Sequence, residues 1–218
     1  MRKLLIALAI VIIGGSLFAW CTLYRIVPQP AWIAATPRDQ YFYGSVDAGK
    51  APGIPYWVWL ALPRMFPEYM PAPGGYAALG LSWEEGKEMP AGFAKQRIGY
   101  IRVTGNCALC HAMQGPPLFP RGVPSVIPST PGKTTNLEPL ITFLRKCAAD
   151  PRFNPDDIFG QVDQATSLSC IDRMLYRCVL IPRTRRMLRD PAAVLFSPEI
   201  LEHMRDPKRV VPARPLVR

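Results

Sequence analysis

Apolar residues form one long run at the start of the chain and only short, interrupted runs elsewhere. The long run extends without a charge from Leu4 to Tyr24, and Arg2 and Lys3 precede it. A helix of this length crosses the roughly 30 Å hydrocarbon core of a bilayer, and positive charges at its start favour a cytoplasmic N-terminus. The pattern predicts that residues 1–25 form a transmembrane helix, an uncleaved signal-anchor that exports the rest of the chain.

The remaining sequence divides by its composition into a linker, a body and a tail. Residues 26–40, with three prolines, are expected to form an extended linker, and residues 206–218 a basic tail. The body, 41–205, starts with a proline-, glycine- and aromatic-rich part that extends to residue 135. Proline fixes φ and removes a hydrogen-bond donor, so 25 prolines interrupt long helices and central strands. We expect this part to be mostly irregular, with short helices and small strands.

Helical spacing of apolar residues appears after residue 135. A helix is expected that begins at the N-cap Asn136 and that Pro151 stops. A second helix is expected over 167–180, ended by Pro182, and a short third one over 198–204.

The chain is basic, with a net charge of +10, and part of the charge follows the second helix as a run of arginines. The run is Arg183, Arg185, Arg186 and Arg189. Such a run is typical of a solvated helix face, and the alternative is a docking site for an anionic partner or lipid. No nucleic-acid-binding motif accompanies it, so a nucleic-acid partner is not expected.

The most specific motif is Cys107-Ala108-Leu109-Cys110-His111, which has the C-x-x-C-H pattern of c-type haem attachment. Two thiols one helical turn apart can reach the two vinyl groups of a porphyrin and form thioethers. The adjacent His111 can then bind the iron as the proximal ligand. Cytochrome maturation occurs outside the cytoplasm, so the predicted export segment fits the motif. The sequence predicts one covalent haem c, with Cys107, Cys110 and His111 as cofactor-binding residues and His111 as the metal ligand.

Two other interpretations of the two cysteines are weaker. A thioredoxin-like dithiol needs a strand before the motif and a βαβ unit around it. The stretch from Ile98 to Val103 fits a strand, but its proline-rich flanks do not continue that pattern. A zinc site needs further paired ligands, whereas the chain has only two histidines and no second C-x-x-C.

The sixth iron ligand stays open at this point. His203 is the only other histidine, and a surface position on a helix is its alternative interpretation. The methionines at 65, 70, 89, 113, 174, 187 and 204 are formal candidates. Of these, Met70 and Met89 lie in proline-flanked loops that can present a thioether, although methionine usually fills gaps in a core. An open sixth position would favour oxygen or peroxide chemistry over electron transfer.

Three more cysteines, Cys147, Cys170 and Cys178, lie in the helical part. A disulfide between Cys170 and Cys178 is not expected, because eight residues of helix separate them by roughly 12 Å. In an oxidising compartment we expect Cys147 to pair with one of the two.

Several blocks of sequence resemble exported c-type cytochromes related to rubber oxygenases and to dihaem cytochrome c peroxidase-like proteins. The blocks are 53–60, 62–67, 73–76, 83–90, 106–111 and 147–153, so the resemblance covers about 41–190. It implies a loop-built fold with short helices around the haem, attached at Cys107 and Cys110 with His111 as axial ligand. Members of that family are longer and carry a second C-x-x-C-H, whereas this chain has one.

The sequence therefore predicts a mainly α fold with extensive irregular loops: a cytochrome c-like haem domain with an N-terminal transmembrane helix. The expected function is that of a membrane-anchored periplasmic cytochrome, on the outer face of the inner membrane, which transfers single electrons to a redox partner protein. The alternative is a haem-dependent oxygenase or peroxidase, or the N-terminal part of one, as the resemblance implies.

Overall fold

The computed structural model describes residues 2–23, 36–44, 51–117, 124–128, 136–198 and 201–202. Its α-helices are α1 (Arg2–Leu23), α2 (Pro37–Tyr43), α3 (Tyr56–Met65), α4 (Glu138–Ala149), α5 (Pro155–Val162), α6 (Cys170–Leu175), α7 (Ile181–Met187) and α8 (Pro191–Leu195). Short 3₁₀ turns are η3 (Pro67–Tyr69), η4 (Gly75–Leu79) and η5 (Cys107–Leu109), and η6 (Tyr176–Leu180) is a π turn. The strands are β1 (Ile54–Pro55), β2 (Phe93–Ile98), β3 (Tyr100–Gly105), β4 (Ala112–Pro117) and β5 (Pro124–Pro128).

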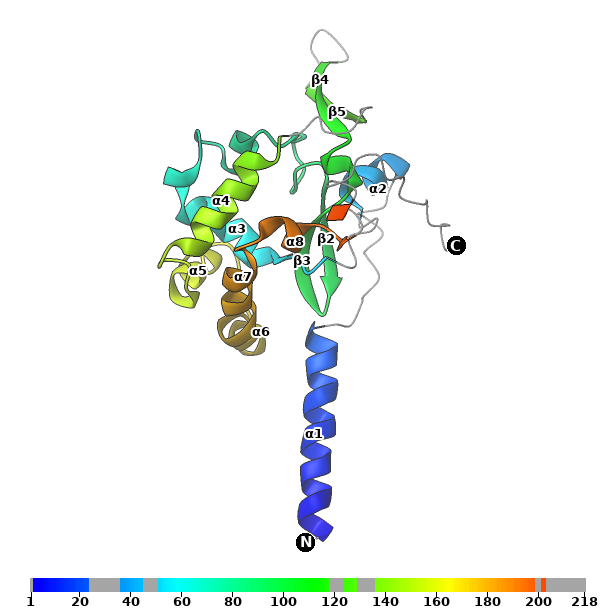
Figure 1. Cartoon of the computed structure of the whole chain (residues 1–218), viewed down its shortest axis with the longest axis vertical. Coiled ribbons are helices and arrows are strands. Elements are labelled where there is room, and N and C mark those ends of the chain that lie inside the picture. The colour runs from blue at the N-terminus through cyan, green and yellow to red at the C-terminus, as the bar shows by residue number, and fades with distance from the viewer. Residues whose placement is uncertain are drawn as a thin grey trace.

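A three-stranded antiparallel sheet organises the part of the body that was expected to be mostly irregular. Its order is β1-β3-β2, and the hairpin of β2 and β3 pairs Phe93 with Gly105 and Ile98 with Tyr100. Gly99 makes this tight turn with a φ of 71°. Helices α3 to α7 gather on one side of the sheet in Figure 1, away from α2, and β4 and β5 form a separate hairpin. Small strands were expected here, but their assembly into one ordered sheet was not.

The core joins α3, η4, β2 and α4 through aromatic side chains. The Trp59 ring stacks on the Tyr76 ring with centroids 3.8 Å apart, and the Phe93 ring lies 5.0 Å from Trp59. Phe143 of α4 meets Tyr76 edge to face, with centroids 6.0 Å apart. The Tyr76 hydroxyl donates to the Trp59 carbonyl at 2.8 Å, so its burial leaves no unpaired polar atom. This cluster fixes β2, the strand that lies next to the C-x-x-C-H segment.

The second predicted helix is longer than expected and passes through Pro182. It begins at Cys170, and α6, η6 and α7 follow one another up to Met187. Within it, the Ile181 N–H donates to the Tyr176 carbonyl five residues earlier. A proline ring in a regular α-helix clashes with the carbonyl four residues before it, and the wider π turn relieves this conflict. The prediction that Pro182 ends the helix was therefore wrong.

The predicted transmembrane helix needs correction. Helix α1 forms over Arg2–Leu23, and its large apolar side chains are exposed, for example Ile10 at 65% and Val11 at 69%. Among the residues that the structure describes, however, no helix combines the length and the apolar character that crossing a membrane requires. The fold class with an N-terminal transmembrane helix is accordingly wrong.

The linker boundary also changes, because α2 begins at Pro37, inside the segment 26–40. Thr36 caps this helix, and its hydroxyl oxygen accepts from the Asp39 N–H at 3.0 Å. The basic tail, 206–218, lies outside the described residues.

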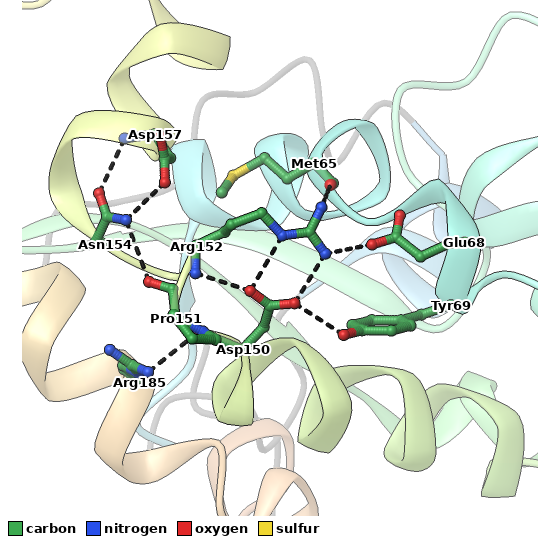
Figure 2. Close-up of polar contacts among 9 residues, drawn as sticks. All are labelled: Met65, Glu68, Tyr69, Asp150, Pro151, Arg152, Asn154, Asp157 and Arg185. Carbon is green, nitrogen blue, oxygen red and sulfur yellow. Dashed lines mark hydrogen bonds and ion pairs between the residues drawn. The ribbon is translucent and has the colours of Figure 1, made fainter.

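The turn after α4 is held by a network of charged groups around Asp150 (Figure 2). The Asp150 carboxylate accepts from the Tyr69 hydroxyl at 2.8 Å and from Arg152 Nη2 at 2.8 Å. Arg152 also pairs with Glu68 and donates to the Met65 carbonyl at 3.4 Å. These contacts tie the end of α4 to the end of α3. The block 147–153, which carries part of the family resemblance, thus has a structural role here.

We expect Asp150→Asn to lower the melting temperature at pH 7 and to have a smaller effect at pH 3. Hydrogen bonds from Arg152 hold the pKa of Asp150 well below its usual value. A carboxyl whose pKa is lowered by folding stabilises the protein fully above its unfolded pKa of about 3.9, and this contribution declines as the pH falls from that value toward the lower folded pKa. Melting curves of both proteins at pH 7, 5, 4 and 3 measure the difference.

The control for this change is Glu85→Gln, which also removes one carboxylate. Glu85 is exposed and has no ion pair among the described residues. Its removal should shift the melting temperature little at any of these pH values. If the melting temperatures of Asp150→Asn and the wild type differ by the same amount from pH 7 to pH 3, the proposed role of the ionised carboxylate is contradicted.

Candidate functional site

The C-x-x-C-H segment folds as one tight turn between β3 and β4. The Cys110 N–H donates to the Cys107 carbonyl at 3.3 Å, and the His111 N–H contacts the carbonyls of Cys107 and Ala108 at 3.2 Å each. A 3₁₀ turn has three residues per turn, so residues three apart lie on the same side. Cys107 and Cys110 are therefore placed on one side of the turn.

The two cysteines of the turn are more exposed than the two residues between them. Cys107 is exposed, and Cys110 and His111 are half-buried. Ala108 and Leu109, between the two cysteines, are buried at 0% and 1% exposure. Neither thiol is in a disulfide. The turn thus presents one exposed cysteine, one half-buried cysteine and a half-buried histidine, while its two apolar residues anchor it in the core.

Asn106 fixes the start of the turn, a role that the sequence analysis did not assign. Its Oδ1 accepts from the Ala108 N–H at 2.9 Å, as an N-cap does. Its Nδ2 donates to the carbonyls of Gly44 at 2.8 Å and Phe42 at 3.3 Å. The side chain is 2% exposed, so these bonds form away from water. An asparagine directly before the first cysteine was the signal that could have predicted this cap.

Gly92 lets the turn approach β2 closely. Its N–H donates to the Phe42 carbonyl at 2.8 Å, and its carbonyl accepts from the Asn106 N–H at 2.9 Å. Its φ is +88°, and a Cβ atom there would lie 2.3 Å from Leu109 Cα. Only glycine fits both the backbone conformation and the space. The position of the C-x-x-C-H turn therefore depends on a residue fifteen positions earlier.

Tyr41 of α2 contacts the other end of the turn. Its hydroxyl donates to the His111 carbonyl at 3.1 Å. Burial raises the pKa of Tyr41, and negative charge on the nearby Cys107 raises it further. The hydroxyl therefore stays protonated around neutral pH and remains a hydrogen-bond donor. Together with Asn106, it fixes the backbone on both sides of the cysteines.

The surroundings of the turn argue against a thioredoxin-like site. A strand does precede the motif, as the alternative required, but β3 pairs antiparallel with both β1 and β2. The residues after Cys110 and His111 enter strand β4, and no helix begins there. A βαβ unit with its dithiol at a helix start is therefore absent from this segment.

The expectation of a metal-binding group also needs correction. Within the described ranges, no group of three or more His, Cys, Asp or Glu side chains could hold a metal ion. His111, predicted as the metal ligand, belongs to no such group. Porphyrin nitrogens supply four of the ligands of haem iron, so a haem would need only an axial protein ligand such as His111.

The candidates for a sixth ligand are spread over the body. Met89 is buried, with 5% exposure, and lines a cleft of about 270 Å³ with Tyr43 and Phe93. Met70 is half-buried beside the core. His203 lies outside the described residues.

The predicted disulfide does not form. None of the six cysteines is in a disulfide, and Cys147 is buried in α4 at 0% exposure while Cys170 and Cys178 are exposed. Burial raises the pKa of Cys147, so its thiol stays protonated. Cys147 is therefore a core residue, and the pairing of Cys147 with Cys170 or Cys178 was wrong.

The chain was compared with known proteins at three levels. No family model matches it, and no curated protein and no solved structure is similar to it at the level required for a match.

Proposed function

We propose that this chain is a single-haem c-type cytochrome that passes single electrons to a redox partner protein. The observation that carries the proposal is the turn at 107–111, in which two cysteines outside any disulfide, one exposed and one half-buried, share one side and a half-buried histidine follows. The chain contains one C-x-x-C-H, which sets the expected haem number at one. The resemblance of six sequence blocks to exported cytochromes supports the same interpretation.

The residues of the turn fit covalent attachment of a haem. Each thiol, Cys107 and Cys110, would add across one vinyl group, with a new S–C bond on one carbon and the thiol hydrogen on the other. This addition needs no oxidant and releases no leaving group. His111 would bind the iron through its imidazole, while its carbonyl stays bonded to Tyr41. The bound haem would supply a one-electron Fe(II)/Fe(III) couple.

The fixed backbone of the turn suits such attachment. Asn106 and Gly92 hold the chain before the first cysteine, and Tyr41 holds it after the second. A pre-organised turn loses little conformational entropy when two covalent bonds form on it. Because cytochrome maturation takes place outside the cytoplasm, the proposal places the body on that side. It does not include a membrane-spanning helix.

The test is expression of the full chain together with a cytochrome maturation system. We expect haem that stays attached after denaturing electrophoresis and a mass increase of one haem. Cys107→Ser/Cys110→Ser should lose both signals. Cys170→Ser/Cys178→Ser likewise removes two cysteines, both exposed, and it should keep both signals.

Each outcome of this test has a clear meaning. No covalent haem on the wild type, or equal haem on both double variants, would overturn the proposal. Carbon monoxide added to the reduced, haem-loaded protein then separates the two haem functions. An unchanged spectrum supports a six-coordinate electron carrier, and a shifted spectrum would replace it with the oxygenase or peroxidase alternative.

A further inference from the structure

A second candidate site lies in a cleft between α4 and α7, on different elements from the C-x-x-C-H turn. The cleft has a volume of about 640 Å³. Two small residues of α4, Ala148 and Ala149, leave room in it, and arginines of both helices line it. Ligand-binding clefts typically have volumes of about 300–1,000 Å³.

Positive charge is concentrated in this cleft. It is lined by Arg145, Arg185, Arg186 and Arg189, and no acidic side chain of the described residues lines it. Like charges that line one cleft repel one another. An anion bound among the arginines would remove this cost.

The four arginines do not all have the same role. Arg185 Nε donates to the Ala148 carbonyl at 3.1 Å, and its Nη2 donates to the Asp150 carbonyl at 3.0 Å (Figure 2 shows Arg185 at Asp150). It thus caps the end of α4. Arg145, Arg186 and Arg189 are exposed, and among the described residues none of them has an ion pair. Their guanidinium groups are therefore available to a ligand.

Two carboxylates that neighbour the cleft residues in contact or in sequence, those of Asp150 and Asp190, are engaged elsewhere. Asp150 directs its carboxylate to Arg152 and Tyr69, and only its backbone carbonyl faces Arg185. Asp190, next to Arg189 in the sequence, caps α8 and accepts from the Ala193 N–H at 3.5 Å. Arg173 and Arg177, earlier in the same helical stretch, by contrast pair with aspartates.

We propose that this cleft binds a phosphate-bearing ligand through Arg145, Arg186 and Arg189. The planar fork of an arginine matches the oxygens of a phosphate and forms two parallel hydrogen bonds with it. The volume exceeds what one phosphate needs, so the cleft suits a diphosphate or the phosphate headgroup of a lipid. The proposal is independent of the haem, because no residue of the turn 107–111 lines the cleft.

The experiment is a calorimetric titration of the full chain with inorganic pyrophosphate at low ionic strength. We expect saturable binding by the wild type and an affinity weaker by about tenfold or more in Arg186→Gln/Arg189→Gln, because each arginine forms charge-assisted hydrogen bonds. The control Arg97→Gln/Arg183→Gln removes the same charge from exposed positions outside the cleft, Arg183 from the same helix. It should bind nearly as the wild type does, and thermal melting checks that all variants are folded.

A parallel titration uses phosphatidylcholine vesicles with and without phosphatidic acid, so that the two sources of phosphate are distinguished. If the wild type binds phosphatidic acid vesicles and only the cleft variant loses this binding, the ligand is a lipid headgroup. If the cleft variant loses binding of pyrophosphate and the vesicles are not bound, the ligand is a soluble phosphate compound. Either result supports the proposed chemistry. Absence of saturable binding to both probes, or equal weakening in the cleft and control variants, would overturn it.

Discussion

Gly92→Ala is expected to lower the free energy of unfolding by about 3 kcal/mol or more, since two costs add. The φ of +88° is a left-handed conformation that costs an alanine about 1–2 kcal/mol. The new Cβ would also lie 2.3 Å from Leu109 Cα and 2.4 Å from Leu109 N, which are backbone atoms that cannot rotate away. The turn that carries Cys107 must shift, so the yield of covalent haem should fall as well. Urea unfolding followed by circular dichroism measures the first effect.

The matched control for this change is Gly86→Ala. Gly86 also has a positive φ, +76°, but a Cβ atom there would meet nothing within 4 Å. It should lose only the conformational part, about 1–2 kcal/mol. Equal losses in the two variants would show that the contact with Leu109 adds nothing and would remove the structural link between Gly92 and the C-x-x-C-H turn.

Trp59→Ala is expected to cost about 3–5 kcal/mol of stability, the usual range for removing a large aromatic side chain from a core. Trp59 is 1% exposed, and its ring contacts Tyr76 and Phe93 from two other elements. The cavity would open at the junction of α3, η4 and β2, and neighbouring backbone cannot close it without losing the sheet. Denaturant unfolding at pH 7 gives the difference in the free energy of unfolding.

Trp20→Ala serves as the comparison for this change. Trp20 is 55% exposed on α1, so its removal should alter the free energy of unfolding by less than about 0.5 kcal/mol. A loss below about 1 kcal/mol for Trp59→Ala would contradict the assignment of Trp59 to the central core.

The local sequence was sufficient to predict the structure of segments whose conformation is decided by neighbouring residues alone. Asn136 and Pro151 bracket α4, which forms over Glu138–Ala149. The N-cap is Leu137, one residue after the predicted Asn136, although the Asn136 side chain still accepts from the Glu138 N–H at 3.1 Å. The spacing of Cys107, Cys110 and His111 likewise predicted that one turn carries all three, because three residues make one 3₁₀ turn. The haem itself stays a prediction from this motif.

Features that depend on contacts between distant segments could not be predicted from the sequence patterns. Pro182 lies within a continuous helical stretch, because a π turn and packing against the core outweigh the local preference to stop. Cys147 is buried rather than bonded, since the side of α4 that faces the core is decided by the elements around it. The transmembrane helix predicted from residues 1–25 was also wrong for the described chain.

The sequence by itself determined the chemistry that short segments carry: a C-x-x-C-H turn, a capped helix and a run of arginines. Only the tertiary structure decided what surrounds each of them. It placed Gly92 and Asn106 against the turn, and it brought Arg145 of α4 to the arginines of α7 to form a basic cleft. The physical reason is that a motif is defined by covalent spacing, whereas a site needs side chains from distant segments, and their meeting depends on how the whole core packs.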